Sequence, residues 1–176
     1  MRLVKAFLAG AIGLFIVMTL LSLLIPSKVK VSRTVLINNT SRAKVFEQVA
    51  TLTNWKNWHP VFKSGDTKII FSSPDVNTAS YAEIIYGAKS AKITITEADS
   101  NFVKFTLQSP GETDVENEIL VSGIPAQSNV QVEWRALNKL KWYPWEKFYG
   151  IFIDKLTGPG YDQALNGLKD YLEARR

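Results

Sequence analysis

The stretch that most constrains this chain lies at its amino end. Residues 6–25 read AFLAGAIGLFIVMTLLSLLI, with no charged residue. Twenty helical residues span roughly 30 Å, about the thickness of the hydrocarbon core of a bilayer. Backbone groups in lipid must be hydrogen-bonded within the segment, so the run is expected to be a helix. We predict a membrane anchor over residues 1–27, crossing the bilayer with residues 3–25, and one folded domain over residues 28–176.

Two other interpretations of this run are weaker. A secretory signal peptide has an apolar region of about 7–15 residues, which is shorter than this one, and residues 23–27 (LLIPS) do not form a cleavage site of the A-x-A kind. A core helix is apolar along one stripe, whereas this run is apolar on every face. We therefore expect an uncleaved anchor and a single-pass membrane protein.

The charges around the anchor leave the side of the membrane open. Arg2 and Lys5 precede the apolar run, and Lys28, Lys30 and Arg33 follow it, so the preference for positive residues on the cytoplasmic side acts on both flanks. Beyond the anchor, 19 Lys and Arg stand against 16 Asp and Glu, scattered along the chain. That balance does not provide the concentrated basic surface of a nucleic-acid-binding domain, and we expect no nucleic-acid partner.

The folded domain begins with alternating segments. In residues 28–38 every second side chain is apolar except Arg33, which falls on the same face; this is the period of a half-buried strand. Between residues 67 and 137, short alternating runs are separated by turn sequences, which predicts an antiparallel meander. The six runs are 68–72, 80–86, 91–97, 102–109, 114–122 and 130–137.

Helical patterns lie on both sides of the meander. Residues 42–52 carry apolar side chains at helical spacing, and residues 53–60 (TNWKNWHP) suit a second short helix that Pro60 ends. Residues 144–172 have the pattern of a long helix, which Gly158-Pro159-Gly160 is expected to kink or break. The predicted fold class is α+β: a seven-stranded antiparallel sheet wrapped on a long carboxyl-terminal helix, with two short helices after the first strand. A space between helix and sheet would suit a small molecule.

Three stretches carry a family resemblance: VSRTVLIN (31–38) leading into KVF (44–46), LTNWKNWHP (52–60) and ALNGLKDYLE (164–173). Together they resemble the START/Bet v 1-like superfamily, also called SRPBCC, and in it the polyketide cyclase/dehydrase branch. The resemblance implies a helix-grip fold around a cavity for a hydrophobic ligand. Members include lipid carriers, hormone binders and cyclases, so the resemblance does not fix the function. Many members carry serine where this chain has His59.

Few residues are candidates for chemistry. His59 is the only histidine and could act as a general base, but no orienting carboxylate or nucleophile stands beside it, so packing at a helix end is the stronger interpretation. Glu83 is the other weak catalytic candidate. Strand parity and the helical stripe place the following residues at the expected ligand cavity: Arg33, Trp58, Tyr81, Glu83, Trp134, Phe148 and Phe152.

Two further clusters stand out in the sequence. Glu112, Asp114, Glu116 and Glu118 share one strand face, but their spacing of about 7 Å is too wide for one cation, so a solvated outer face is expected rather than a metal site. Residues 142–149 (WYPWEKFY) are rich in aromatics, which occur in helix cores, in ligand pockets and at membrane interfaces.

These observations favour binding or transport of a hydrophobic small molecule or lipid by a membrane-anchored domain. No cofactor and no metal are expected. One alternative is a cyclase- or dehydratase-like enzyme that acts on a hydrophobic substrate with His59 or Glu83. Another is a protein-interaction module in which the cavity has collapsed.

Overall fold

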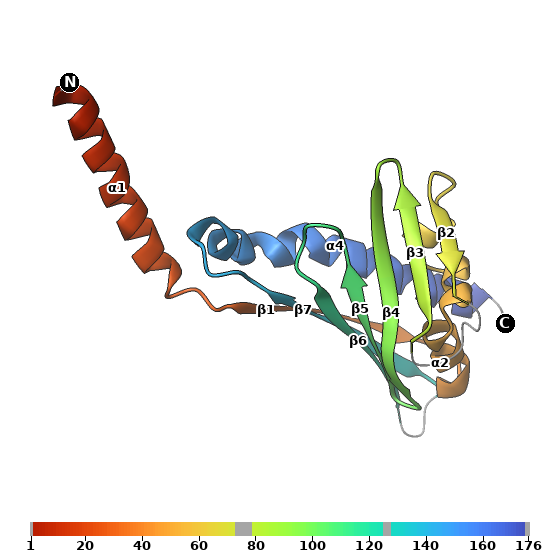
Figure 1. The fold of residues 1–176 in the computed structure, drawn as a ribbon. Helices are drawn as coiled ribbons and strands as arrows, with labels where there is room; N and C mark the ends of the chain where they lie inside the picture. Colours follow the sequence, from red (N-terminus) through yellow and green to blue (C-terminus); the bar gives the residue numbers. More distant parts are fainter. Residues whose placement is uncertain (1, 73–78, 125–127, 175–176) are drawn as a thin grey trace.

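The computed structural model describes residues 2–72, 79–124 and 128–174, and its elements follow the predicted order (Figure 1). The helices and strands are α1 (Arg2–Ser22), β1 (Lys28–Ile37), α2 (Arg42–Ala50), the 3₁₀ helix η1 (Leu52–Asn57), α3 (Pro60–Lys63), β2 (Lys68–Phe71), β3 (Tyr81–Tyr86), β4 (Lys89–Asp99), β5 (Phe102–Gln108), β6 (Val115–Gly123), β7 (Val130–Lys139) and α4 (Pro144–Ala174). The predicted α+β helix-grip fold is confirmed.

The described strands form one seven-stranded sheet in the order β1-β7-β6-β5-β4-β3-β2, and every neighbouring pair is antiparallel. β1 joins the end of the meander by pairing with β7 from Lys28 opposite Lys139 to Ile37 opposite Val130. A register shift between Ile95 and Glu97 interrupts the pairing of β4 with β5, and such bulges bend and twist a strand. The sheet is strongly twisted and has one concave, apolar face (Figure 1).

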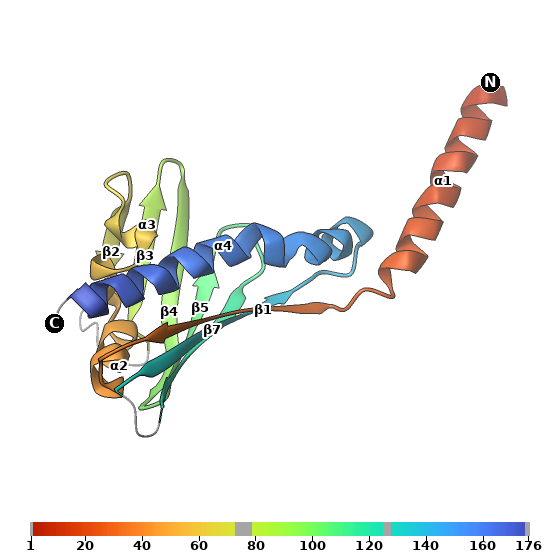
Figure 2. The ribbon, with the colours of Figure 1, turned by 180° about the vertical axis from the view of Figure 1, so that it is seen from behind.

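Helix α4 crosses the concave face of the sheet (Figure 2). Its second half buries Ala164, Leu165 and Leu168 in the main core. Gly158-Pro159-Gly160 does not break it, because α4 is continuous from Pro144 to Ala174 with Pro159 inside. A proline in a helix interior removes one hydrogen bond and crowds the preceding turn, and the flanking glycines carry no side chain to add to that crowding.

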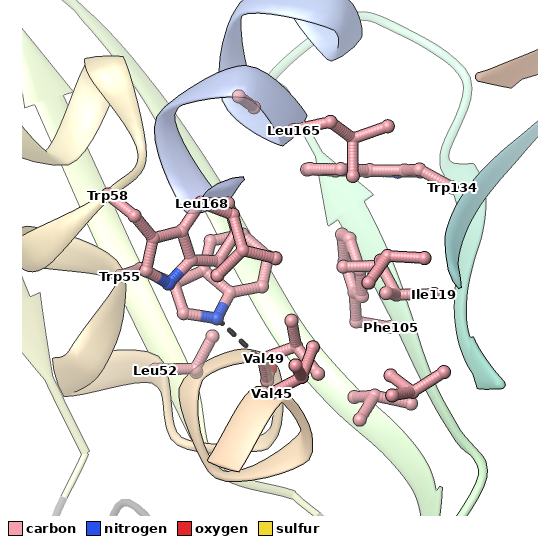
Figure 3. Packing of buried hydrophobic residues seen from close by; sticks show 14 of the residues in the cluster. Val45, Val49, Leu52, Trp55, Trp58, Phe105, Ile119, Trp134, Leu165 and Leu168 are labelled. Carbon is pink, nitrogen blue, oxygen red and sulfur yellow. Dashed lines mark hydrogen bonds between the residues drawn. The ribbon is translucent and has the colours of Figure 1, made fainter. Parts of the chain in front are cut away.

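The two tryptophans of TNWKNWHP close one end of the layer between α4 and the sheet (Figure 3). Trp55 and Trp58 are both fully buried, as their spacing predicts. The indole N–H of Trp55 donates to the carbonyl of Val49 (3.1 Å), and that of Trp58 donates to the carbonyl of Gln48 (3.1 Å). These bonds satisfy the polar edge of each ring and fix η1 against the end of α2.

Pro60 begins a helix, whereas the sequence suggested that it ends one. After η1 ends at Asn57, the backbone of His59 is extended and Pro60 takes the first position of α3. Proline suits that position because the first N–H groups of a helix have no partner within it. His59 therefore lies in the turn between η1 and α3.

Arg33 fastens α4 to β1 from the concave face. Its guanidinium lies against the backbone of Gly158, where a Cβ atom would be 2.0 Å from Nη2. It donates to Asp154 (2.9 and 3.2 Å) and to Asp162 (3.1 Å). Because Asp154 precedes the Gly-Pro-Gly segment and Asp162 follows it, one arginine ties both halves of α4 to the sheet edge.

Helix α1 extends away from the folded domain (Figures 1 and 2). Its side chains are exposed except near its end, where Ser22 is buried. Among the described residues it is the one helix whose length and composition would allow it to cross a membrane, although a signal sequence at an amino end has the same properties.

We predict that Gly167→Ala lowers the free energy of unfolding by about 1–3 kcal/mol, the usual effect of overpacking. The new Cβ would lie 2.3 Å from the backbone oxygen of Trp58, so α4 would have to move away from η1. Gly160→Ala is the matched control, since its Cβ would meet nothing within 4 Å and alanine favours a helix over glycine by about 0.5–1 kcal/mol. Thermal unfolding in detergent, followed by circular dichroism, compares the two variants. Equal melting temperatures would contradict this close approach.

Candidate ligand-binding cavity

A hollow of about 440 Å³ lies between α4 and the concave face of the sheet. Its lining comes from the turn after η1, from the inner faces of the meander strands and from the middle of α4. The lining residues are Trp55, His59, Val61, Ile84, Tyr86, Ala91, Ile93, Phe105, Leu107, Ser109, Asn117, Trp134, Thr157, Gly160 and Tyr161. No described residue in this set carries a carboxylate, an ammonium or a guanidinium group.

Aromatic rings make up one wall of the hollow. Trp134 of β7 lies 5.1 Å from the ring centre of Tyr161, 5.7 Å from that of Phe105 and 5.9 Å from that of Trp55. The rings are tilted or edge-to-face, which is the preferred geometry of aromatic pairs. Trp55, Phe105 and Trp134 each contact the other two (Figure 3), and Tyr161 packs on Trp134, so the wall is preformed.

The indole N–H of Trp134 and the amide of Asn117 beside it are hydrogen-bonded within the protein. The indole N–H of Trp134 donates to Oδ1 of Asn117 (3.0 Å), and Nδ2 of Asn117 donates to the carbonyl of Val115 (3.0 Å). Asn117 is buried on β6, so these bonds offset the cost of burying its amide. Burial raises the pKa of Tyr161 above its ordinary value, so its phenol remains neutral.

His59 adds a titratable group to the lining. Its ring stacks on Trp55 with the centres 5.4 Å apart and the planes 15° from parallel. The buried Nδ1 has no hydrogen-bond partner among the described residues. Burial lowers the pKa of His59 from 6.5 to about 4, because the charged imidazolium loses its hydration. The side chain is therefore neutral at pH 7.

The structure brings only some of the expected cavity residues together. Trp134 lines the hollow, and so does His59, the catalytic candidate, whereas Trp58 packs in the core beside it. Tyr81 and Glu83 lie on the outer face of β3, because Ala82 and Ile84 take the inner face. There Glu83 pairs in register with Lys92.

The remaining expected residues belong to other surroundings. Arg33 lies on the concave face but is bound to Asp154 and Asp162. Phe148 is half-buried, and Phe152 is exposed on α4. The first half of α4 has apolar residues on two faces, one toward the sheet and one toward solvent. Phe152 lies on the face toward solvent.

Sequence reasoning did not place several residues of the wall in the cavity, notably Phe105, Asn117 and Tyr161. Alternation along β5 and β6 marks Phe105 and Asn117 as inward, with Asn117 as the polar exception on an apolar face. Tyr161 stands in the helical stripe of α4. Its place depends on where α4 crosses the sheet, which only the tertiary structure gives.

Two other hollows help to define the site. One of about 390 Å³ shares Leu107, Thr157 and Tyr161 with the first, so it continues along α4 toward the end nearest α1. A larger one of about 750 Å³ lies outside, between α2 and the β4–β5 turn, and includes the charged Arg42 and Asp99. The hollow under α4 is the candidate ligand site, because small-molecule sites are concave and mainly apolar.

Glu116 and Glu118 lie on the outer face of β6, whereas Glu112 precedes this strand and lines the hollow of about 390 Å³. Glu116 pairs with Lys139 and Glu118 with Arg135. Among the described residues, no group of three or more His, Asp or Glu side chains has the arrangement of a metal site.

His59 predicts a pH dependence of stability. The unfolded chain binds a proton on His59 below pH 6.5 and the folded chain does so only below about pH 4, so stability rises with pH between these values. The loss from pH 7 to pH 4 is about 3 kcal/mol, at about 1.4 kcal/mol per pKa unit. Unfolding midpoints are compared between pH 6.5 and 4.5. Below this range the protonation of Glu133 also lowers stability, because folding lowers the pKa of Glu133 from 4.5 to about 2. His59→Gln should flatten the profile, and an unchanged slope in that variant would contradict a buried neutral His59.

Comparison with known proteins agrees with the geometry. The family model described as "polyketide cyclase / dehydrase and lipid transport" matches residues 28–173, and a search of the curated proteins found no match. Solved structures from three bacteria have the same fold at low identity. A Nitrosospira multiformis protein is 12% identical with a TM-score of 0.62, over 84% of this chain and 99% of that one.

The other two proteins are similar to the same extent. A Thermobifida fusca protein is 18% identical with a TM-score of 0.61, over 84% of this chain and 95% of its own. A protein of unknown function from Staphylococcus aureus is 15% identical with a TM-score of 0.61, over 84% and 96%. At these identities the structures establish the fold, whereas the family model covers nearly the whole folded domain. The chain belongs to the polyketide cyclase/dehydrase and lipid transport family.

Proposed function

We propose that this chain is a membrane-anchored protein that binds a neutral, hydrophobic small molecule or lipid in the hollow under α4. One observation carries the proposal: a preformed hollow of about 440 Å³ whose described lining residues carry no charge at pH 7. This volume lies within the usual range of small-molecule sites, about 300–1,000 Å³.

The lining also indicates which ligands to expect. Burying apolar surface contributes about 25 cal/mol per Å², so a ligand that buries about 300 Å² gains about 7.5 kcal/mol before the entropic cost of association. An ionised group in this hollow would lose its hydration without a counter-ion, which costs several kcal/mol. The ligand is therefore a neutral molecule with few polar atoms.

The apolar helix α1 supports a location at the membrane. It has the length and composition of a membrane span, and the folded domain starts within a few residues of its end. Poorly soluble molecules are concentrated in lipid, so an anchor would hold the cavity next to its ligand source. The family description includes lipid transport, which agrees with this class of ligand.

The enzyme alternative depends on His59. It faces the hollow, but Nδ1 has no partner in the described chain and Glu83 lies on the outer face. A general base is ordinarily oriented by a second group, so binding is the better-supported function. The interaction-module alternative requires a collapsed cavity, and a hollow of this volume argues against it.

We predict that full-length protein extracted from membranes in mild detergent carries a hydrophobic ligand, detectable by native mass spectrometry and identified by lipid analysis. Ala91→Phe should remove that ligand, because Ala91 is buried on β4 and lines the hollow. Ala98→Phe is the matched control, since it makes the same change on the same strand at an exposed position that lines the outer hollow instead. Circular dichroism shows whether both variants keep the fold.

The contrary results are equally clear. Wild-type protein without an enriched ligand would contradict the binding proposal, and loss of ligand in Ala98→Phe but not in Ala91→Phe would move the site to the outer hollow. The same spectra report the intact mass, and a protein lacking its first residues would show that α1 is a cleaved signal.

A further inference from the structure

The first half of α4 has a second apolar face that the fold does not use. Successive residues turn by about 100° around a helix, so Trp145, Tyr149, Phe152 and Leu156 form one stripe within about 60°. This stripe points away from the buried Lys147 and Gly150, which face the domain. Trp145 is 62% exposed, Phe152 54% and Leu156 60%. Trp142, just before the helix, is also exposed.

This stripe ends at the Gly158-Pro159-Gly160 segment. Beyond it, the exposed residues of α4 are polar apart from Ala174; they are Asp162, Gln163, Asn166 and Asp170. The second half of the helix is thus amphipathic in the ordinary way, with one apolar face toward the core. Leaving four large apolar side chains in water on the first half alone is unfavourable.

The structure also ties this part of α4 to the end of α1. The buried ammonium group of Lys147 donates to the carbonyl of Ile25 (3.1 Å) and to Oγ of Ser27 (2.5 Å). The N–H of Leu140 donates to the carbonyl of Ser27 (2.8 Å). Three hydrogen bonds therefore hold the short segment after α1 against the start of α4 and the connection that precedes it.

The segment between α1 and β1 also exposes apolar side chains, like the stripe on α4. Leu23 and Leu24, directly after α1, are 70% and 82% exposed. Lys28 and Lys141 are exposed at the same end of the domain. Tryptophan and tyrosine prefer the headgroup level of a bilayer, and each nearby lysine adds about 1 kcal/mol of attraction to anionic lipid.

We infer that the segment from Trp142 to Leu156 lies on the bilayer surface, with the first half of α4 as an interfacial helix. The inference rests on the proposed membrane span of α1, because the bonds from Lys147 and Leu140 then hold α4 at the level where the span leaves the lipid. Trp145, Tyr149, Phe152 and Leu156 insert among the headgroups and upper acyl chains. An amphipathic helix of this kind lies in the interface plane with its apolar face toward lipid.

This arrangement orients the cavity. Tyr149 belongs to the stripe and also lines the second hollow, which shares Thr157 and Tyr161 with the ligand site. Docking α4 on the bilayer therefore brings the near end of these connected hollows to the lipid surface, whereas an anchor alone would leave the cavity free to face any direction.

The sequence contains no cysteine, so single-cysteine variants of the full chain can carry one environment-sensitive fluorophore each. Tyr149→Cys and Phe152→Cys probe the stripe. Asn166→Cys is the matched control on the polar half of the same helix, and Ile12→Cys is the control inside α1. The protein is reconstituted at one copy per nanodisc in equimolar phosphatidylcholine and phosphatidylglycerol, with and without brominated acyl chains.

The expected result is a blue-shifted emission and loss of fluorescence with brominated lipid at positions 12, 149 and 152, with no change at 166. Quenching at 12 but water-like emission at 149 and 152 would overturn the inference and leave the anchor standing. Blue-shifted but unquenched labels at 149 and 152 would overturn it in favour of a protein contact. Absence of quenching at position 12 would overturn both the membrane span of α1 and the docking of α4 on the bilayer. Ligand binding is tested separately, by mass spectrometry.

Discussion

The architecture depends on a mismatch of size: one helix must cover seven strands. A helix is about 10–12 Å across, whereas seven strands spaced about 4.8 Å apart measure about 29 Å. The second half of α4 therefore covers part of the concave face, and η1 and α3 close another part with Trp55, Trp58 and Phe62. What remains uncovered is the hollow, so the cavity follows from the same packing that stabilises the fold.

In the segment TNWKNWHP, residues of the core and residues of the cavity wall are neighbours in the sequence. Trp58 is bonded to Gln48 and belongs to the core, while its neighbours Trp55 and His59 face the hollow. His59 lies in the turn between η1 and α3, and Pro60 sets the end of this turn because it is the first residue of α3. Burial keeps His59 neutral, so a chemically reactive residue here acts as part of an uncharged wall.

Local patterns in the sequence predicted the strands, the long helix and the burial of the tryptophan pair, because alternation and helical spacing are local properties. The cavity was harder to predict. Tyr81 and Glu83 were assigned to it by parity, yet Ala82 and Ile84 occupy the inner face of β3, and one residue of offset reverses a strand. Phe152 and Tyr161 both follow helical spacing, but which of them meets the sheet depends on the crossing of α4, a tertiary property.

The central claim is that the uncharged hollow between α4 and the sheet holds a ligand, with α1 and the outer stripe of α4 keeping that hollow at the membrane. The most direct measurement is an experimental structure of full-length protein purified from its native membrane. The account predicts density for one elongated apolar molecule against Trp134 and Tyr161. Hydrogen-bonded water filling the hollow, or a ligand bound instead between α2 and the β4–β5 turn, would contradict it.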